Sequence, residues 1–369
     1  MRLESIELHH IRLPLRESFE TSFGITRDRD AILVNIRAPG AQGWGECVAG
    51  QVPDFSYETT HTVWHVLSDF IIPAVLASEL SEPQDLRRIA AGIRGHPMAK
   101  AGIEAALWDL FSLQAGQSLS RFLGGKAERV SVGVSVGIQD DTARLIETVE
   151  NYTHQGYARI KVKIKPGRDV EDVRAVRKAF PGLALQVDAN AAYTLQDLAV
   201  FKALDELDLA MIEQPLGAPN LTDHSRLQAQ LRTPVCLDES IGDAGGASAA
   251  IDLGACRVIN IKPGRVGGLE EARRIHDLCA QRGVPVWCGG MLETGIGRAA
   301  NVALATLPNF RLPGDLSASA RYYAEDIIER PFELNSDSTL TVPTGAGIGV
   351  SIRWDRLRRA TLRRAVFKA

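Results

Sequence analysis

Short apolar runs alternate with amphipathic helical segments through the middle of the chain. Eight runs have the length and composition of buried strands, and they cover residues 130–137, 159–164, 183–188, 209–213, 234–238, 257–262, 285–289 and 310–314. The intervening segments, such as DVEDVRAVRKAF, repeat apolar residues at helical spacing. This alternation predicts parallel strands that are joined by right-handed helical crossovers.

Eight strand–helix units close into a barrel more naturally than they form an open sheet. The alternative, an open doubly wound sheet, would need a Gly-x-Gly-x-x-Gly turn after its first strand. The first run instead reads Gly133-Val134-Ser135-Val136-Gly137, which does not supply that turn. The sequence therefore predicts an α/β fold that contains a TIM-type (β/α) barrel.

The two ends of the chain differ from its middle. Residues 1 to about 125 begin with alternating strand patterns and continue with helical ones, including MAKAGIEAALWDLFSLQAG, and this order predicts an α+β unit. The tail returns to strand and turn signals such as STLTVPTGAGIGV. The barrel is therefore expected to lie between two segments that lack its regular alternation of strands and helices.

The composition excludes several classes of protein. Among 369 residues, 42 basic side chains nearly balance 45 acidic ones, which argues against a nucleic-acid partner. No run approaches the roughly 20 apolar residues of a membrane helix, and the start of the chain, MRLESIELHH, lacks the apolar stretch of a secretory signal. The five cysteines are odd in number, widely spread and without a C-x-x-C motif. We expect a cytoplasmic globular protein that binds no membrane.

An ionisable residue ends each of five successive apolar runs. These residues are Lys163, Asp188, Glu213, Asp238 and Lys262, at intervals of 25, 25, 25 and 24 residues. The chemistry of a barrel takes place at the carboxyl ends of its strands. The common spacing therefore predicts that all five side chains meet on one rim of the barrel.

The residue types at this rim indicate a metal-assisted reaction. Three converging carboxylates repel one another unless a cation lies between them, and hard oxygen ligands suit Mg²⁺, or Mn²⁺ in its place. The two lysines should face each other across the barrel mouth. This arrangement predicts removal and return of a proton α to a substrate carboxylate.

Each of these residues also has a simpler structural interpretation. An isolated K-x-K can be the solvated end of an edge strand, and Lys163–Lys165 is an alternative pair to Lys161–Lys163, although Lys165 precedes a Pro-Gly turn. Asp188 and Asp238 taken alone could be helix N-caps. The register of all five residues favours the catalytic interpretation.

The motifs at these positions resemble those of the enolase superfamily, muconate-lactonizing subgroup. They are Lys161-x-Lys163, Asp188-x-Asn190, Glu213-Gln214-Pro215, Asp238-Glu239-Ser240 and Lys262-Pro263-Gly264-Arg265. The longer stretches IEQPL, CLDESI, NIKPGRVGG and FRLPGDLSAS are similar to those of o-succinylbenzoate synthases that also racemise N-succinylamino acids.

This resemblance implies a role for each motif. Asp188, Glu213 and Asp238 would be the Mg²⁺ ligands, and Lys163 and Lys262 would act on opposite faces of the substrate. In the synthase reaction, a step of the menaquinone pathway, one lysine takes the α-proton and its conjugate acid helps to expel hydroxide as water. In racemisation both lysines transfer protons.

The resemblance also implies a domain layout and a substrate pocket. Residues 1–125 would form a capping domain, 126–320 the barrel and 321–369 a segment that packs back on the capping domain. Residues expected to contact substrate or support the metal site are Lys161, Asn190, Ser135, Glu239, Arg265, Gly290 and Met291, and those expected in a lid are Phe19, Thr21 and Phe23. Arg265, as a nearby like charge, would help to lower the pKa of Lys262, or it would only hold the structure in place.

More than one function is compatible with these motifs. Dipeptide epimerases carry Asp-x-Asp at the eighth strand, where this chain has Asp315-Leu316-Ser317, which counts against a free-amine substrate. The motifs would also suit a muconate cycloisomerase, or a non-enzymatic protein with a vestigial site. His276 and Cys288 are interpreted as structural. A small-molecule carboxylate is the expected substrate, and a homo-oligomer the expected assembly.

Overall fold

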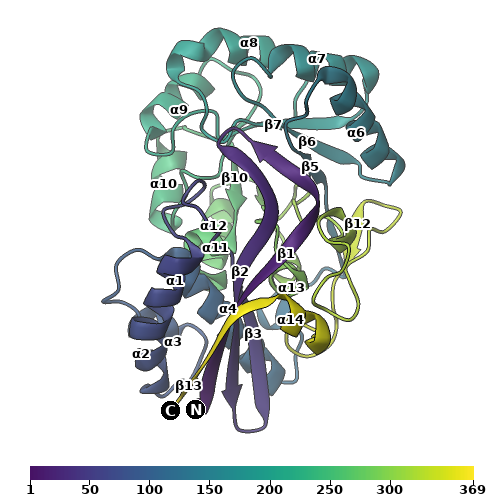
Figure 1. The fold of residues 1–369 in the computed structure, drawn as a ribbon. Helices are drawn as coiled ribbons and strands as arrows, with labels where there is room; N and C mark the ends of the chain where they lie inside the picture. The colour runs from purple at the N-terminus through teal and green to yellow at the C-terminus, as the bar shows by residue number, and fades with distance from the viewer.

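A four-stranded antiparallel sheet forms the centre of the N-terminal part of the chain (Figure 1). The computed structural model describes residues 1–369. The strands are β1 (Ser5–Thr21), β2 (Gly24–Ala38), β3 (Ala41–Cys47) and β13 (Thr361–Lys368), in the order β13-β1-β2-β3. The C-terminal strand β13 therefore pairs with β1, so that the two ends of the chain belong to one sheet.

Short helices and one long helix cover this sheet and bury a second, smaller hydrophobic core. They are α1 (Thr60–Val66), a π-helical turn (Leu67–Ile71), α2 (Ile72–Leu76), α3 (Asp85–Ile89), α4 (Pro97–Gln114) and α5 (Leu119–Phe122). None of the helices in the structure combines the length and apolar character that crossing a bilayer requires.

Glycines allow β3 to lie directly on α4. A Cβ atom on Gly45 would be 2.2 Å from the Gly102 carbonyl oxygen, and one on Gly43 would be 2.2 Å from the Ala106 oxygen. Conversely, a Cβ on Gly102 would lie 2.7 Å from Cys47 Cβ. The backbones of strand and helix are thus closer than any larger residue would permit.

Seven parallel strands form a curled sheet that makes most of a barrel. They are β5 (Val134–Val136), β6 (Arg159–Lys163), β7 (Ala184–Asp188), β8 (Ile212–Glu213), β9 (Val235–Leu237), β10 (Val258–Ile261) and β11 (Val286–Cys288), in sequence order. The predicted barrel architecture is confirmed. Its first predicted strand is split, because β4 (Arg129–Ser131) pairs instead with β12 (Thr339–Thr341), antiparallel.

The prediction of an eighth regular strand over 310–314 is wrong. This segment makes only isolated bridges, Val286 with Phe310 and Val132 with Gly314. Pro313 has no N–H to donate, which prevents a continuous ladder. The segment nevertheless lies between β11 and the residues that join β4 to β5, since Arg311 N donates to Val286 O (3.2 Å) and Gly133 N donates to Gly314 O (2.8 Å).

Helices surround the parallel sheet and bury the larger hydrophobic core against it (Figure 1). They are α6 (Thr142–His154), α7 (Val170–Ala179), a 3₁₀ turn (Leu195–Asp197), α8 (Leu198–Asp205), α9 (Leu221–Gln228), α10 (Ala244–Asp252), α11 (Pro263–Val266), α12 (Leu269–Gln281) and α13 (Gly295–Leu304). After the barrel come a 3₁₀ turn (Ser319–Arg321) and α14 (Trp354–Ala360).

Two carboxylates of the N-terminal domain cap barrel helices across the interface. Glu46 accepts hydrogen bonds from Thr294 Oγ1 (2.7 Å) and Gly297 N (3.0 Å) at the start of α13. Glu104 accepts one from Leu269 N (2.5 Å) at the start of α12. Because the first N–H groups of a helix have no partner within it, these contacts satisfy them and join the barrel helices to the N-terminal domain.

The glycine contact between β3 and α4 generates a test. Gly45→Ala is expected to lower the free energy of unfolding by about 2–3 kcal/mol, because the added methyl group must push strand and helix apart. Urea denaturation would measure the change. Gly182→Ala is the matched control, since a Cβ there meets nothing within 4 Å. Equal stability of the two variants would contradict the packing argument.

Candidate active site

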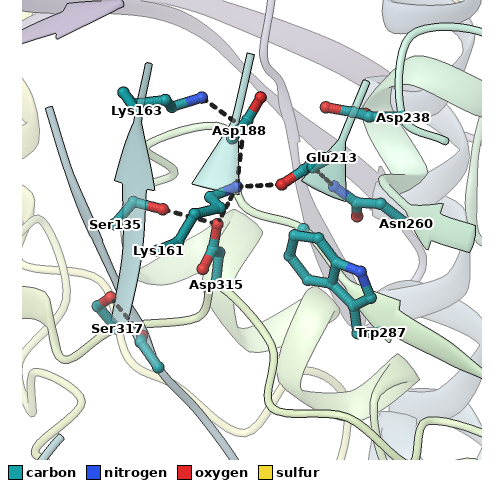
Figure 2. Close-up of polar contacts among 12 residues, drawn as sticks. Ser135, Lys161, Lys163, Asp188, Glu213, Asp238, Asn260, Trp287, Asp315 and Ser317 are labelled. Atoms are coloured by element: carbon teal, nitrogen blue, oxygen red, sulfur yellow. Dashed lines mark hydrogen bonds and ion pairs between the residues drawn. The ribbon is translucent and has the colours of Figure 1, made fainter. Parts of the chain in front are cut away.

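The five ionisable residues predicted to share a rim lie together at the barrel mouth. Figure 2 shows four of them, Lys163, Asp188, Glu213 and Asp238. Lys163, Asp188 and Glu213 end β6, β7 and β8, and they are neighbours in the strand register. Asp238 and Lys262 follow β9 and β10. All three carboxylates have no exposed surface, and the two lysines are also buried.

Basic side chains neutralise each of the three carboxylates. Lys163 Nζ lies 2.7 Å from Asp188 Oδ2, and Lys262 Nζ lies 2.6 Å from Asp238 Oδ2. Lys161 Nζ donates to Glu213 Oε2 (2.9 Å). The rim is therefore a closely packed array of opposite charges.

Lys161 lies deeper in the barrel and joins the rim to a carboxylate that sequence reasoning had not assigned to the site. Its Nζ is 3.1 Å from Asp188 and 2.6 Å from Asp315 (Figure 2). Asp315 also pairs with Arg159 Nη1 (2.5 Å) and accepts from Ser135 Oγ (2.8 Å). Its position just after the eighth barrel segment was the available signal.

The pKa values reflect this crowding. Burial would lower the pKa of Lys161 and Lys262, but the neighbouring carboxylates outweigh burial and raise both. Burial and the charge of Asp188 raise the pKa of Glu213 to about 8. For Asp188, burial acts upward, whereas Lys163 and Lys161 hold the pKa below its usual range.

The carboxylate set fits a divalent cation by its chemistry. No group of three or more His, Cys, Asp or Glu side chains is arranged around a common point in this structure. The pKa of Glu213 is raised first by burial and then by the charges of Asp188 and Asp238, and a divalent cation between these acids would offset both effects. Nearby, Glu239 Oε2 is buried without a hydrogen-bond partner. Enzymes of the superfamily this rim resembles generally use a divalent metal.

Side chains behind the rim hold the carboxylates in place. Asn190 N donates to Asp188 Oδ1 (2.9 Å), and its Nδ2 donates to Glu239 Oε1 (2.9 Å). Arg265 pairs with Asp238 and donates to two backbone oxygens. Burial acts to lower the pKa of Lys262, but Asp238, Glu213 and Glu239 raise it above its usual value, and the expected effect of Arg265 stays a prediction.

A cavity of about 390 Å³ opens onto both catalytic candidates. Predicted residues that line it are Lys161, Lys163, Lys262, Asn190, Ser135, Gly290, Met291, Phe19, Thr21 and Phe23. Glu239 and Arg265 instead border a neighbouring groove. The volume suits a small-molecule ligand.

The walls from the N-terminal domain approach the two lysines. The Phe19 ring centre lies 6.0 Å from Lys163 Nζ, and the Phe55 ring centre lies 4.5 Å from Lys262 Nζ. Phe55 was not among the residues that the sequence placed in the lid. Ser22 Oγ donates to the Asn190 carbonyl (3.3 Å), which joins the β1–β2 turn to the barrel.

The remaining candidates lie outside this cavity. Lys165 pairs with Glu20 (2.9 Å) and is partly exposed, so Lys163–Lys165 is not the pair that the cavity contains. His276 is buried, stacks on Phe310 and makes a 2.9 Å hydrogen bond with Asn309 N, as a structural residue does. Cys288 is a buried free thiol.

Known proteins match the whole chain. Residues 5–124 match the family described as mandelate racemase / muconate lactonizing enzyme, N-terminal domain, and residues 144–356 match enolase C-terminal domain-like. An o-succinylbenzoate synthase from Geobacillus stearothermophilus is 50% identical over 100% of this chain and 98% of its own length. An N-succinylamino acid racemase from Thermus thermophilus is 47% identical, with 98% of each chain covered. The crystal structure of an enolase superfamily member from Listeria innocua superposes with a TM-score of 0.96 at 41% identity, covering 100% of this chain and 99% of that one.

The contacts of Asp315 generate a stability test. Asp315→Asn should lower the unfolding free energy at pH 7 by about 3 kcal/mol, because Arg159 and Lys161 lose a buried counter-charge. The ion pairs hold the pKa of Asp315 below its usual range against the effect of burial. The stabilisation is therefore present above about pH 4 and lost as the pH falls further.

Urea denaturation at several pH values would check this expectation. The difference between wild type and variant should shrink below about pH 4. Asp337→Asn is the control, because its pair with Arg129 is exposed and should contribute little. Equal stability of wild type and Asp315→Asn at pH 7 would show that the buried pair is not needed.

Proposed function

Because the chain belongs to the enolase superfamily and carries the N-terminal domain of the mandelate racemase / muconate lactonizing enzymes, we propose that it removes a proton α to a substrate carboxylate. It is an enzyme of this superfamily. We assign it o-succinylbenzoate synthase activity, N-succinylamino acid racemase activity or both, since relatives with these names are 50% and 47% identical to it over nearly their full lengths.

The placement of two amines on opposite sides of one cavity is the observation that supports this proposal most directly. Lys163 ends β6 and Lys262 follows β10, with three strands between them in the sheet. Both side chains line the cavity. A carbon held between them would meet an amine on each face.

Proton transfer by these amines accounts for both reactions. In the dehydration, neutral Lys163 Nζ takes the α-proton, and the resulting ammonium returns a proton to the departing hydroxyl, which leaves as water while the carbon–carbon double bond forms. In racemisation one lysine removes the proton and the other delivers a proton to the opposite face. Lys262 as a cation would also stabilise negative charge on the substrate.

Asp188, Glu213 and Asp238 are the residues that would hold a divalent metal, which we propose to be Mg²⁺, with Mn²⁺ as a substitute. When bound, such an ion would release the lysines from their carboxylate partners and stabilise negative charge on the substrate carboxylate. Asn190 and Arg265 would keep Asp188 and Asp238 oriented through the contacts described above.

The competing functions have weaker support. Asp315 is neutralised by Arg159 and Lys161, so it is not available to bind the ammonium group that a dipeptide epimerase must hold. A chloromuconate cycloisomerase is only 26% identical to this chain. The expected cytoplasmic location, menaquinone pathway and homo-oligomeric state stay predictions.

The metal assignment is tested by Glu213→Gln. A neutral amide is a poorer ligand for a hard dication, so Mg²⁺ affinity should fall by at least the roughly 10–100-fold typical of perturbed metal sites. Titration calorimetry would measure affinity, turnover against Mg²⁺ concentration would measure activity, and circular dichroism would verify folding. Full activity of this variant at sub-millimolar Mg²⁺ would refute the ligand assignment.

The roles of the two lysines are tested by α-proton exchange in deuterium oxide. Lys163→Ala should abolish exchange for one enantiomer of an N-succinylamino acid and Lys262→Ala for the other, each by about 10²–10⁴-fold, and both should stop racemisation. Lys165→Ala is the matched control and should retain both exchanges. If either catalytic variant still exchanged both enantiomers, the opposed amines would not be the bases. If the wild-type protein exchanged no α-proton of an N-succinylamino acid or of the o-succinylbenzoate synthase substrate, the proposed function would be refuted.

A further inference from the structure

One buried guanidinium in the wall of the cavity has no carboxylate partner. Arg29, in β2, is 7% exposed and lines the cavity. Its Nη2 donates to the Val48 carbonyl oxygen (2.5 Å), whereas its Nε is enclosed without any partner. No ion pair joins Arg29 to an acid. A buried cation of this kind is costly unless a ligand supplies the counter-charge.

The neighbouring cations of the cavity are already paired or exposed. Lys161, Lys163 and Lys262 each contact rim carboxylates, as described above. Arg27, also in the wall, is exposed to water. Arg29 is thus the buried cation of this cavity that no carboxylate contacts, although its charge does lower the pKa of nearby Glu46.

The neighbouring acids are committed to other partners. Asp30 accepts from His10 (2.7 Å) and Arg12 (2.8 Å). Glu46 accepts a hydrogen bond from Thr294 Oγ1 at the start of α13, and Glu58 accepts one from Met98 N (2.7 Å). An incoming anion would therefore not have to displace a carboxylate from Arg29.

The contacts of Arg29 place it on the Lys262 side of the cavity. Val48, whose carbonyl oxygen accepts from Arg29, packs on the loop after Lys262: a Cβ on Gly264 would lie 2.3 Å from Val48 Cγ2. The guanidinium belongs to the capping domain, whereas the metal-ligand candidates belong to the barrel. Arg29 and Lys262 both line this cavity, so a ligand with two separated acidic groups would find a cationic side chain from each domain there.

We propose that Arg29 binds a second, distal carboxylate of the substrate, remote from the carboxylate at the reacting carbon. This inference rests on the proposed function and assigns a specific residue to the second carboxylate of its substrates. A guanidinium suits the task because its planar N–H groups match a carboxylate in a charge-assisted hydrogen bond. Both relatives named above have succinyl compounds in their names, and a succinyl group ends in such a carboxylate.

Binding of two matched ligands tests this proposal without requiring turnover. N-Succinylglycine carries the distal carboxylate, and its terminal amide, N-(3-carbamoylpropanoyl)glycine, has the same shape without that charge. Titration calorimetry with Mg²⁺ present should show wild type binding the succinyl ligand at least about 10-fold more tightly. Arg29→Met should weaken the succinyl ligand by about 10–100-fold and the amide by less than about threefold.

Two further variants separate charge from shape. Arg29→Lys keeps a cation and should restore part of the preference for the succinyl ligand. Arg27→Met removes an exposed charge two residues away and should change the ratio of the two affinities by less than about twofold, because water screens that charge. Equal weakening of both ligands in Arg29→Met would mean that Arg29 only shapes the cavity, and the proposal would be overturned.

The outcomes also distinguish this inference from the proposed function. If Arg29→Met does not fold, the proposal is tested by the affinities of wild type and of Arg29→Lys for the two ligands. Equal affinity of wild type for both ligands would refute an anion site at Arg29. If the enzyme exchanges α-protons but Arg29 does not affect the preference for N-succinylglycine over its terminal amide, the proposed function stands and the inference about Arg29 fails. If Arg29 is needed to bind N-succinylglycine but no α-proton is exchanged, the inference stands and the proposed function fails.

Discussion

Negative charge buried at the carboxyl ends of the barrel strands is the constraint on which the rest of this structure depends. Asp188, Glu213 and Asp238 have no exposed surface, and buried carboxylates must be neutralised or protonated. Lysines from β6 and from the loop after β10 provide the opposing charge. The same amines are those that the proposed reaction needs as bases, so the stability of the metal-free rim and its chemistry depend on one set of ion pairs.

The charge balance continues below and above the rim with different results. Below it, Asp315 pairs with both Arg159 and Lys161, so its negative charge is balanced without any ligand. Above it, in the capping domain, Arg29 has only a carbonyl partner. The charges at and below the rim are therefore paired within the protein. In the capping domain the charge of Arg29 lacks an acidic partner, and at this position a ligand with a matching negative charge can be distinguished from one without it.

The cavity exists only because two domains are held in a fixed relation. Its walls come from the β1–β2 turn and the segment after β3 on one side and from the barrel strands on the other. Glu46 in β3 and Glu104 in α4 attach barrel helices to the capping domain. The glycines of β3 and α4 allow this strand and this helix to pack with their backbones in contact. Substitutions remote from the chemistry can therefore change the shape of the pocket.

The sequence by itself determined the barrel and its rim, because strand periodicity and a repeat of about 25 residues place Lys163, Asp188, Glu213, Asp238 and Lys262 at equivalent strand ends wherever the strands are parallel. It misjudged the strand at 310–314, where a proline interrupts the ladder. It also did not show that Arg265 pairs with Asp238, because nearness in sequence does not say which way a guanidinium points. Only the tertiary structure decided that Asp315 belongs to Lys161, that Phe55 faces Lys262 and that Arg29 is without an acidic partner. Those facts depend on contacts between segments far apart in the chain, and local pattern carries no information about which distant charge meets which.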